Sequence, residues 1–196
     1  GQWRILVAEG EDVAAGSALV EVIGTPVELA TAEDHVLGAL GFASGIATVA
    51  RRFVVRAPQG LRIVCGGWKK LPASVKPILR DALAAAGVSP RLLEGDFVYT
   101  DKNTRKMFGG IAEMVSAARA VGHGGVSVQV KAVADAEVAA RAGASAIMVD
   151  TGRIEDLIEA NALLARAGLR DGITLAFSGG VQPEDFAAVR AAGADA

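Results

Sequence analysis

The sequence predicts an α/β protein, in which a small N-terminal α/β domain with a β-hairpin precedes a parallel βα barrel. The first part of the chain has strand-like segments followed by one long helical stretch. From residue 61 onward, short apolar strands alternate with Ala-rich helices in units of about 25 residues, the pattern of a parallel sheet. We place the two domains at 1–55 and 56–196. We expect the chain to be incomplete at both ends.

The N-terminal domain begins with strands over residues 1 to about 27. Gly10 and Gly16 bracket polar turns, Val13, Leu19 and Val22 occupy apolar strand positions, and Pro26 closes the hairpin. A long helix is then expected from about 28 to 53, because apolar residues recur there at helical spacing. Its glycines at 38, 41 and 45 indicate close packing or a break near 45.

The second domain is expected to repeat one βα unit. We predict strands at 61–65, 97–100, 126–130, 146–149 and 173–177, and helices at 74–86, 110–120, 134–142, 154–167 and 183–192. A glycine closes four of these helices, at 87, 143, 168 and 193. An open doubly wound sheet is the alternative. No Gly-x-Gly-x-x-Gly follows the first of these strands, which weighs against a dinucleotide-binding fold.

Composition excludes several classes of function. The net charge is −2 and aromatic residues make up 5% of the chain, so neither nucleic-acid binding nor base stacking is expected. The single cysteine, Cys65, fits a reducing cytosol. We find no signal peptide and no apolar run of about 20 residues, so we expect a cytoplasmic protein without a membrane span.

In a βα barrel the active site lies at the carboxyl ends of the strands. Here those ends carry basic, acidic and glycine-rich segments, which suit a phosphate-bearing ligand with a divalent cation. The candidates are Trp68, Lys69, Lys70, Lys102, Arg105, Lys131, Asp150, Ser178, Gly179 and Gly180.

Three of these segments also have a purely structural interpretation. The Ser178-Gly179-Gly180 turn either holds a phosphate on its backbone N–H groups or is a plain turn that caps a helix. Asp150 either contacts a ligand or caps the helix that follows it. The basic string 101–106, which includes Arg105, is either an anion clamp or a solvated loop.

The hairpin at 9–24, Ala32-Glu33 and the Ser44-Gly45-Ile46-Ala47-Thr48 string resemble the quinolinate phosphoribosyltransferase (carboxylating nicotinate-nucleotide pyrophosphorylase) family. The resemblance runs from about residue 9 to 196 and indicates a divergent member. It implies a type II phosphoribosyltransferase-like fold and NAD biosynthesis. Nicotinate mononucleotide would form from phosphoribosyl pyrophosphate, with Mg²⁺, and a pyridine carboxylate such as quinolinate. It also implies a homodimer or higher homo-oligomer.

The resemblance assigns roles to individual residues. The Ser178-Gly179-Gly180 turn would hold the 5′-phosphate, and Asp150 would contact the ribose or its metal ion. Lys69 falls on the lysine of a Thr-Arg-Lys-Thr-x-Pro-Gly motif. Lys69, Lys102 and Asp150 are therefore the candidate catalytic residues, with Asp150 also the candidate metal ligand. The candidate substrate-binding residues are Trp68, Lys70, Arg91, Arg105, Gln129, Lys131, Ser178, Gly179 and Gly180.

The chain departs from the family pattern where a dicarboxylate would be held. Trp68 and Asp34 stand where the family has arginines, and only Arg91 remains near an Asn-His-Arg segment. The Glu-Val-Glu-Val strand is replaced by 127–130, where Gln129 keeps hydrogen-bonding ability only. Two alternatives therefore stay open. One is a paralogue that binds a phosphoribosyl compound with another acceptor or without turnover. The other is a different phosphate-binding barrel enzyme with Lys131 as a Schiff-base lysine.

Overall fold

The computed structural model describes residues 1–122 and 124–196, so His123 lies outside the described residues. The chain divides into two compact units. The first contains residues 1–55 and 65–90, and the second contains residues 56–64 and 91–196. Residues 65–90, which the predicted boundary assigns to the second domain, therefore group with the first unit.

The first unit begins with a two-stranded antiparallel hairpin, as expected. Strand β1 (Gln2–Ile5) pairs with β2 (Val20–Ile23), with Gln2 opposite Ile23. The connection between them is longer than the sequence indicated, and Val13 lies in it rather than in a strand. Pro26 does not close the hairpin. It is the first residue of the helix that follows, where a missing backbone N–H costs nothing.

Helix α1 (Pro26–Val54) is the long helix that the apolar spacing predicted. Thr25 and Glu28 form a capping box, in which each side chain accepts a hydrogen bond from the other residue's backbone N–H. The helix continues through its glycines. A Cβ at Gly38, Gly41 or Gly45 would have no neighbour within 4 Å, so the expectation of close packing or a break is wrong.

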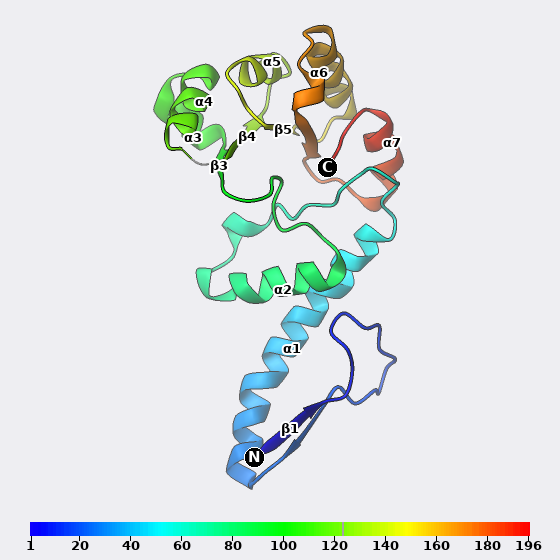
Figure 1. Ribbon diagram of the computed structural model, residues 1–196. Helices are drawn as coiled ribbons and strands as arrows, with labels where there is room; N and C mark the ends of the chain where they lie inside the picture. The colour runs from blue at the N-terminus through cyan, green and yellow to red at the C-terminus, as the bar shows by residue number, and fades with distance from the viewer. Residues whose placement is uncertain (123) are drawn as a thin grey trace. The chain divides into compact units, whose positions relative to one another are not determined.

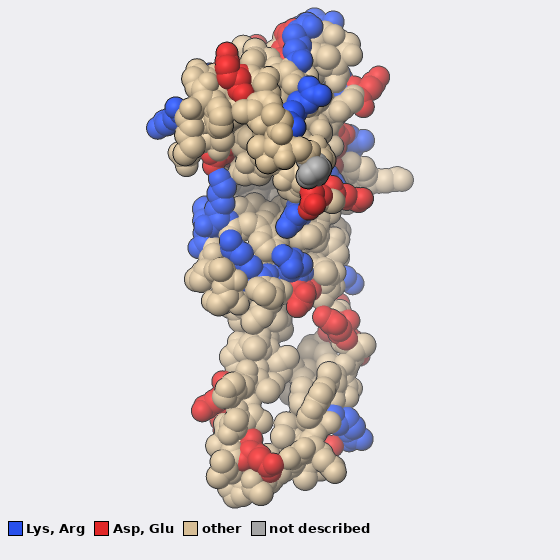
Figure 2. All heavy atoms as spheres, turned by 60° about the vertical axis from the view of Figure 1, so that its left-hand side comes forward, with Lys and Arg blue, Asp and Glu red and all other residues tan. Residues whose placement is uncertain are grey.

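Helix α1 is also conspicuous for its exposed apolar surface. None of its residues is buried, and the lower part of Figure 2 shows charged side chains separated by uncharged surface. By length and composition it is the one described helix that could cross a membrane. The charge-free stretch 35–50 is about 24 Å long at helical rise, whereas a bilayer core is about 30 Å thick.

The first unit ends with short helical turns η1 (Trp68–Lys70) and η2 (Ala73–Val75), followed by helix α2 (Lys76–Ala86). Helix α2 contacts α1 and buries Leu79, Ala82, Leu83 and Ala86. Gly87 ends it in the left-handed conformation, as its position in the sequence indicated.

The second unit contains a four-stranded parallel sheet in the order β3-β4-β5-β6. The strands are β3 (Phe97–Thr100), β4 (Gly125–Val130), β5 (Ala146–Asp150) and β6 (Thr174–Ser178). All four agree with the predicted strands to within one residue at each end. The strand predicted at 61–65 is not formed, and only Val64 makes an isolated bridge.

Helices cover one face of this sheet (Figure 1). Helices α4 (Ile111–Ala120), α5 (Ala134–Arg141) and α6 (Ile154–Arg166) each connect neighbouring parallel strands, and the strand order runs in one direction. Right-handed crossovers then place all three on the same side. Val128, Ile147, Leu157 and Leu175 are fully buried between the sheet and the helices.

The remaining helical segments of the second unit are shorter. They are α3 (Lys102–Phe108), η3 (Arg170–Gly172), η4 (Pro183–Asp185) and α7 (Phe186–Ala191). Helix α3 occupies the basic string for which a loop was expected, so that expectation is wrong.

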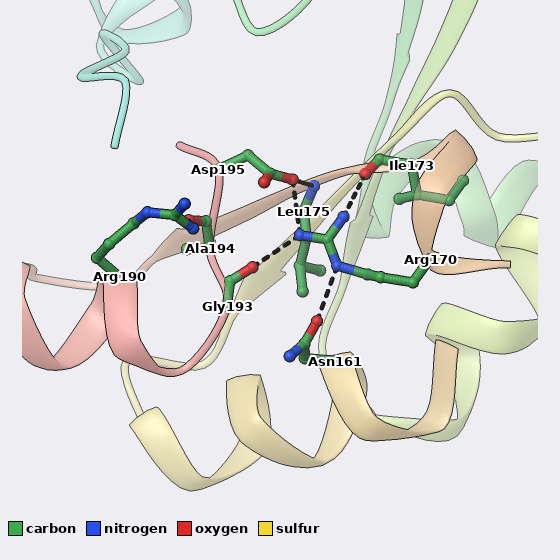
Figure 3. Close-up of polar contacts among 8 residues, drawn as sticks. All are labelled: Asn161, Arg170, Ile173, Leu175, Arg190, Gly193, Ala194 and Asp195. Atoms are coloured by element: carbon green, nitrogen blue, oxygen red, sulfur yellow. Dashed lines mark hydrogen bonds and ion pairs between the residues drawn. The ribbon is translucent and has the colours of Figure 1, made fainter. Parts of the chain in front are cut away.

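Arg170 ties together three segments at the amino-terminal side of β6 (Figure 3). Its guanidinium donates to Asn161 Oδ1 at 2.8 Å, to the carbonyl oxygens of Ile173 and Gly193 at 2.8 Å, and to Asp195 Oδ2 at 2.9 Å. The same Asp195 oxygen accepts the backbone N–H of Leu175. Arg170 therefore fixes the strand from the edge opposite to the carboxyl ends.

Candidate functional site

Three neighbouring strands bring polar side chains to the carboxyl edge of the sheet. Val130 is in register with Val149, and Asp150 is in register with Ser178. Because side chains alternate across a strand, Gln129, Lys131, Asp150 and Ser178 share the face that α4, α5 and α6 do not cover. The prediction that the strand ends bring Lys131, Asp150 and Ser178 together at one edge of the sheet is confirmed.

Asp150 is the centre of the cluster. The Ser178 hydroxyl donates to its Oδ1 at 2.8 Å, and the Lys131 ammonium lies 2.8 Å from its Oδ2. The Gln129 amide also donates to Oδ2, and Lys131 donates to the Asp150 backbone carbonyl. Both carboxylate oxygens are thus engaged, and no cap is formed on the following helix, for which Arg153 is the N-cap residue.

The ionisation of Asp150 follows from these contacts. Its partial burial alone would raise the pKa of the carboxyl group. The hydrogen bonds from Lys131 and Ser178, the charge of Lys131 and the hydrogen bond from Gln129 together outweigh that effect. The pKa of Asp150 therefore lies below its ordinary value, and the group is a carboxylate at neutral pH.

Tyr99 and Ser127, on the same face but nearer the amino ends of their strands, were not singled out from the sequence. Tyr99 is in register with Ser127, one strand away. The pKa of Tyr99 is raised, first by burial and then by the negative charges of Asp101 and Asp150. The Ser127 hydroxyl is fully buried without a hydrogen-bond partner among the described residues. The period-two alternation of 127, 129 and 131 was the signal that could have found Ser127.

The glycine turn after β6 lies beside this cluster. Gly179 and Gly180 have φ values of 120° and 86°, which favour glycine. A Cβ on Gly179 would lie 2.5 Å from the backbone nitrogen of Gly152, so two backbones approach closely here. The helical turn after Gln182 is short, and Asp185 already accepts the Gln182 N–H. An anion would therefore contact the exposed turn itself.

The predicted residues on β3 and its following helix have structural partners. Asp101 is buried and caps α3 by accepting the backbone N–H groups of Asn103 and Thr104. Lys102 is the exposed first residue of that helix. Arg105 pairs with Asp135 at 2.5 Å. The Arg105 guanidinium is therefore engaged by Asp135 and is not free to bind an anion.

Arg91 belongs to the second unit, before β3. Its guanidinium lies 5.9 Å from the centre of the Phe97 ring, close enough for a cation–π contact. It is exposed.

Trp68, Lys69 and Lys70 form the turn η1 in the first unit. The Trp68 indole donates to the carbonyl oxygen of Pro90, and the Arg80 guanidinium lies 5.7 Å from its ring centre. Lys69 and Lys70 are exposed. Trp68 stands where the family resemblance led us to expect an arginine. Arg80 instead supplies a guanidinium beside the Trp68 ring. Asp34 lies exposed on α1.

The surroundings of Asp150 do not fit a Mg²⁺ ion. Mg²⁺ requires oxygen ligands in octahedral geometry, whereas Asp150 faces an ammonium, an amide N–H and a hydroxyl that donates to it. Within the described ranges, no three His, Cys, Asp or Glu side chains gather in a group able to hold a metal. This departs from the expectation that Asp150 is a metal ligand.

Comparisons with known proteins match most of the chain. The family model described as the C-terminal domain of quinolinate phosphoribosyl transferase matches residues 46–196. Two archaeal proteins named as probable carboxylating nicotinate-nucleotide pyrophosphorylases are similar over 91% of this chain. The protein from Methanothermobacter thermautotrophicus is 26% identical, and that from Archaeoglobus fulgidus is 27% identical. The chain spans 65% and 70% of their lengths, respectively.

Solved structures share the fold over almost the whole chain. NadC from Streptococcus pyogenes matches with a TM-score of 0.78 and 23% identity, covering 98% of this chain and 66% of its own. The nicotinate-nucleotide pyrophosphorylase from Francisella tularensis matches at 0.82 and 24% identity, covering 99% and 68%. The one from Ehrlichia chaffeensis matches at 0.84 and 19% identity, covering 99% and 69%. The hairpin and the parallel βα arrangement are thereby confirmed.

Proposed function

The chain belongs to the quinolinate phosphoribosyl transferase family, and from this premise we propose that it takes part in nicotinate mononucleotide formation for NAD biosynthesis. The substrates would be phosphoribosyl pyrophosphate, carrying Mg²⁺ on its pyrophosphate, and a pyridine carboxylate such as quinolinate. The observation that carries the proposal is the Asp150 cluster beside the Gly179-Gly180 turn, at the carboxyl edge of a parallel sheet.

The cluster suits the sugar phosphate half of such a substrate. A turn of two glycines lets phosphate oxygens approach backbone N–H groups closely. The Asp150 carboxylate next to it would accept hydrogen bonds from ribose hydroxyls, and its negative charge would stabilise positive charge on the sugar ring. Lys131, beside Asp150, would face negatively charged oxygens of the ligand.

The reaction requires positioning more than a nucleophilic side chain. The pyridine nitrogen would bond to C1 of the ribose as the C1–O bond breaks through an oxocarbenium-like state. The pyrophosphate leaves with the bonding electron pair. Loss of CO₂ from the ring then leaves an electron pair on carbon, which takes up a proton. Lys69 and Lys102 are proposed to bear part of the pyrophosphate charge.

The remaining candidates would contact the acceptor or the outer phosphates. We assign Trp68, Lys70 and Arg91 to the pyridine carboxylate, and Arg105, Gln129 and Lys131 to the phosphoribosyl group. A homodimer in the cytoplasm completes the proposal. It is supported by the apolar surface of α1, where Val27, Leu37 and Val49 are more than half exposed. A groove of about 670 Å³ lies between α1 and the hairpin.

The alternative is a paralogue that binds the phosphoribosyl compound without turnover. Specific contacts favour it: Arg105 is paired with Asp135, and the Trp68 ring is covered by Arg80. These groups would have to exchange partners before they could bind substrate.

Pyrophosphate release tests the proposal. The purified protein would be incubated with phosphoribosyl pyrophosphate, Mg²⁺ and either quinolinate or nicotinate. We expect release with quinolinate, and a loss of at least about 100-fold in kcat/KM for Asp150→Asn, about 2.7 kcal/mol of transition-state stabilisation. Asp171→Asn, an exposed carboxylate in η3, is the matched control and should retain activity. Binding without turnover would establish the alternative, and the absence of binding would contradict both.

A further inference from the structure

The positive charge of Lys131 lies beside the Asp150 carboxylate, where a divalent cation would lie in a metal-dependent phosphate site. We infer that Lys131 is the resident counter-ion of Asp150, and that this sheet edge binds the sugar phosphate of a nucleotide without a protein-bound Mg²⁺. The inference rests on the proposed function and concerns how the same site is charged.

The backbone register explains why Lys131 reaches Asp150. Val130 and Val149 are partners on adjacent strands, so the next residues, Lys131 and Asp150, lie level with each other. Their side chains project from the same face. Lys131 directly follows the last paired residue of β4. Its side chain is half-exposed, so it remains accessible to a ligand.

The Lys131 ammonium contacts two oxygen atoms of Asp150, as a bound metal ion would. This ammonium lies 2.8 Å from Asp150 Oδ2 and also donates to the Asp150 backbone carbonyl. Two of the three oxygens of Asp150 therefore face the ammonium, and the third, Oδ1, accepts the Ser178 hydroxyl. An ammonium has three N–H donors, so one N–H remains for an oxygen of a bound phosphate.

With Lys131 in place, the carboxylates at this edge are all engaged. Ser178 and Gln129 donate to the carboxylate. Asp101 is engaged in capping α3, and Asp135 is paired with Arg105. A divalent ion would stand beside the Lys131 ammonium, and like charges a few ångströms apart repel strongly. One carboxylate and one ammonium already balance each other.

The test measures nucleotide binding with and without metal. Calorimetry would follow nicotinate mononucleotide, which has no pyrophosphate to carry Mg²⁺, in EDTA and in millimolar MgCl₂. We expect the dissociation constants of the unmodified protein to agree within about twofold. Lys131→Gln should bind about tenfold more weakly in EDTA, the loss of one charge-assisted hydrogen bond. It should regain affinity in MgCl₂, because an ion can then occupy the vacated position. Arg166→Gln, an exposed cation in the last turn of α6, should change neither value.

The outcomes separate this inference from the proposed function. Binding by the unmodified protein that requires Mg²⁺ would overturn the inference and leave the proposed function standing. A Lys131→Gln protein whose affinity ignores Mg²⁺ would also overturn it. If that variant does not fold, titration of the unmodified protein with MnCl₂ alone decides. No binding at millimolar Mn²⁺ supports the inference, and saturable binding contradicts it. Failure to bind the nucleotide in either buffer would contradict the proposed function itself.

Discussion

Asp150 and Ser178 are register partners at the carboxyl ends of β5 and β6, and the Ser178 hydroxyl donates to Asp150 Oδ1 at 2.8 Å. The pair joins the carboxylate at the centre of the candidate site to the first residue of the glycine turn. Any ligand phosphate on Gly179 and Gly180 would therefore be next to a sugar held by Asp150. Strand pairing fixes this neighbourhood, so a substitution at Asp150 or in the turn acts on the same small region.

The first prediction concerns pH. The pKa of Asp150 is lowered in the folded state, because its hydrogen bonds and Lys131 outweigh the opposing effect of burial. These contacts therefore stabilise the fold fully above the pKa of the unfolded group, and the stabilisation is lost as the pH falls through the lowered folded value. The difference in unfolding free energy between the unmodified protein and Asp150→Asn should be constant between about pH 5 and pH 8. It should shrink below about pH 4. Urea unfolding at each pH measures it, and a difference that grows on acidification would contradict the assignment.

The second prediction concerns Tyr99. The chain has a single tyrosine, so absorbance of the phenolate at 295 nm reports Tyr99 alone. Burial and the charges of Asp101 and Asp150 raise its pKa above the ordinary value of 10.0. Rapid alkaline titration should show the raised pKa of Tyr99 in the folded protein, and an ordinary pKa in the protein unfolded by guanidinium. Asp150→Asn should bring the folded pKa closer to 10.0, since one of the negative charges is removed. An unchanged pKa would mean that Asp150 does not act on Tyr99.

The third prediction concerns the turn at Gly179. An added Cβ would lie 2.5 Å from the backbone nitrogen of Gly152, in addition to the strain of φ 120°. Gly179→Ala should lower the unfolding free energy by at least about 2 kcal/mol. Gly168→Ala is the control, because Gly168 also has positive φ but has open space around its Cβ position. That variant should lose only about 1 kcal/mol. Equal losses in guanidinium unfolding would show that the contact between the two turns carries no cost.

The fourth prediction concerns Arg170. Its guanidinium makes four hydrogen bonds, and its side chain is 21% exposed. Arg170→Met removes these donors and leaves Asn161 Oδ1, two backbone carbonyl oxygens and Asp195 without them, which should cost about 2–3 kcal/mol. Arg166→Met, on the exposed end of α6, should change stability by less than about 0.5 kcal/mol. Denaturant unfolding compares the two, and similar losses would contradict a structural role for the Arg170 network.

The sequence determined the parallel βα pattern and the residues at its strand ends. The alternation of apolar and polar residues in 126–131 is a local property, and the glycine after each helix is a local stop signal. These local features are sufficient to predict that Lys131, Asp150 and Ser178 lie at one edge of the sheet. Local signals also produced errors. The basic string at 101–106 was expected to be a loop, whereas Asp101 caps a helix there.

Tertiary structure decided which charges are partnered. Strand register joined Lys131 to Asp150, and the packing of helical segments joined Arg105 to Asp135 and Arg80 to Trp68. The sequence contains each of these groups but not the distances between them, because residues far apart in the chain meet only through pairing and packing. Whether a metal ion fits depends on those distances. Only the fold could show that Asp150 is already paired with the Lys131 ammonium.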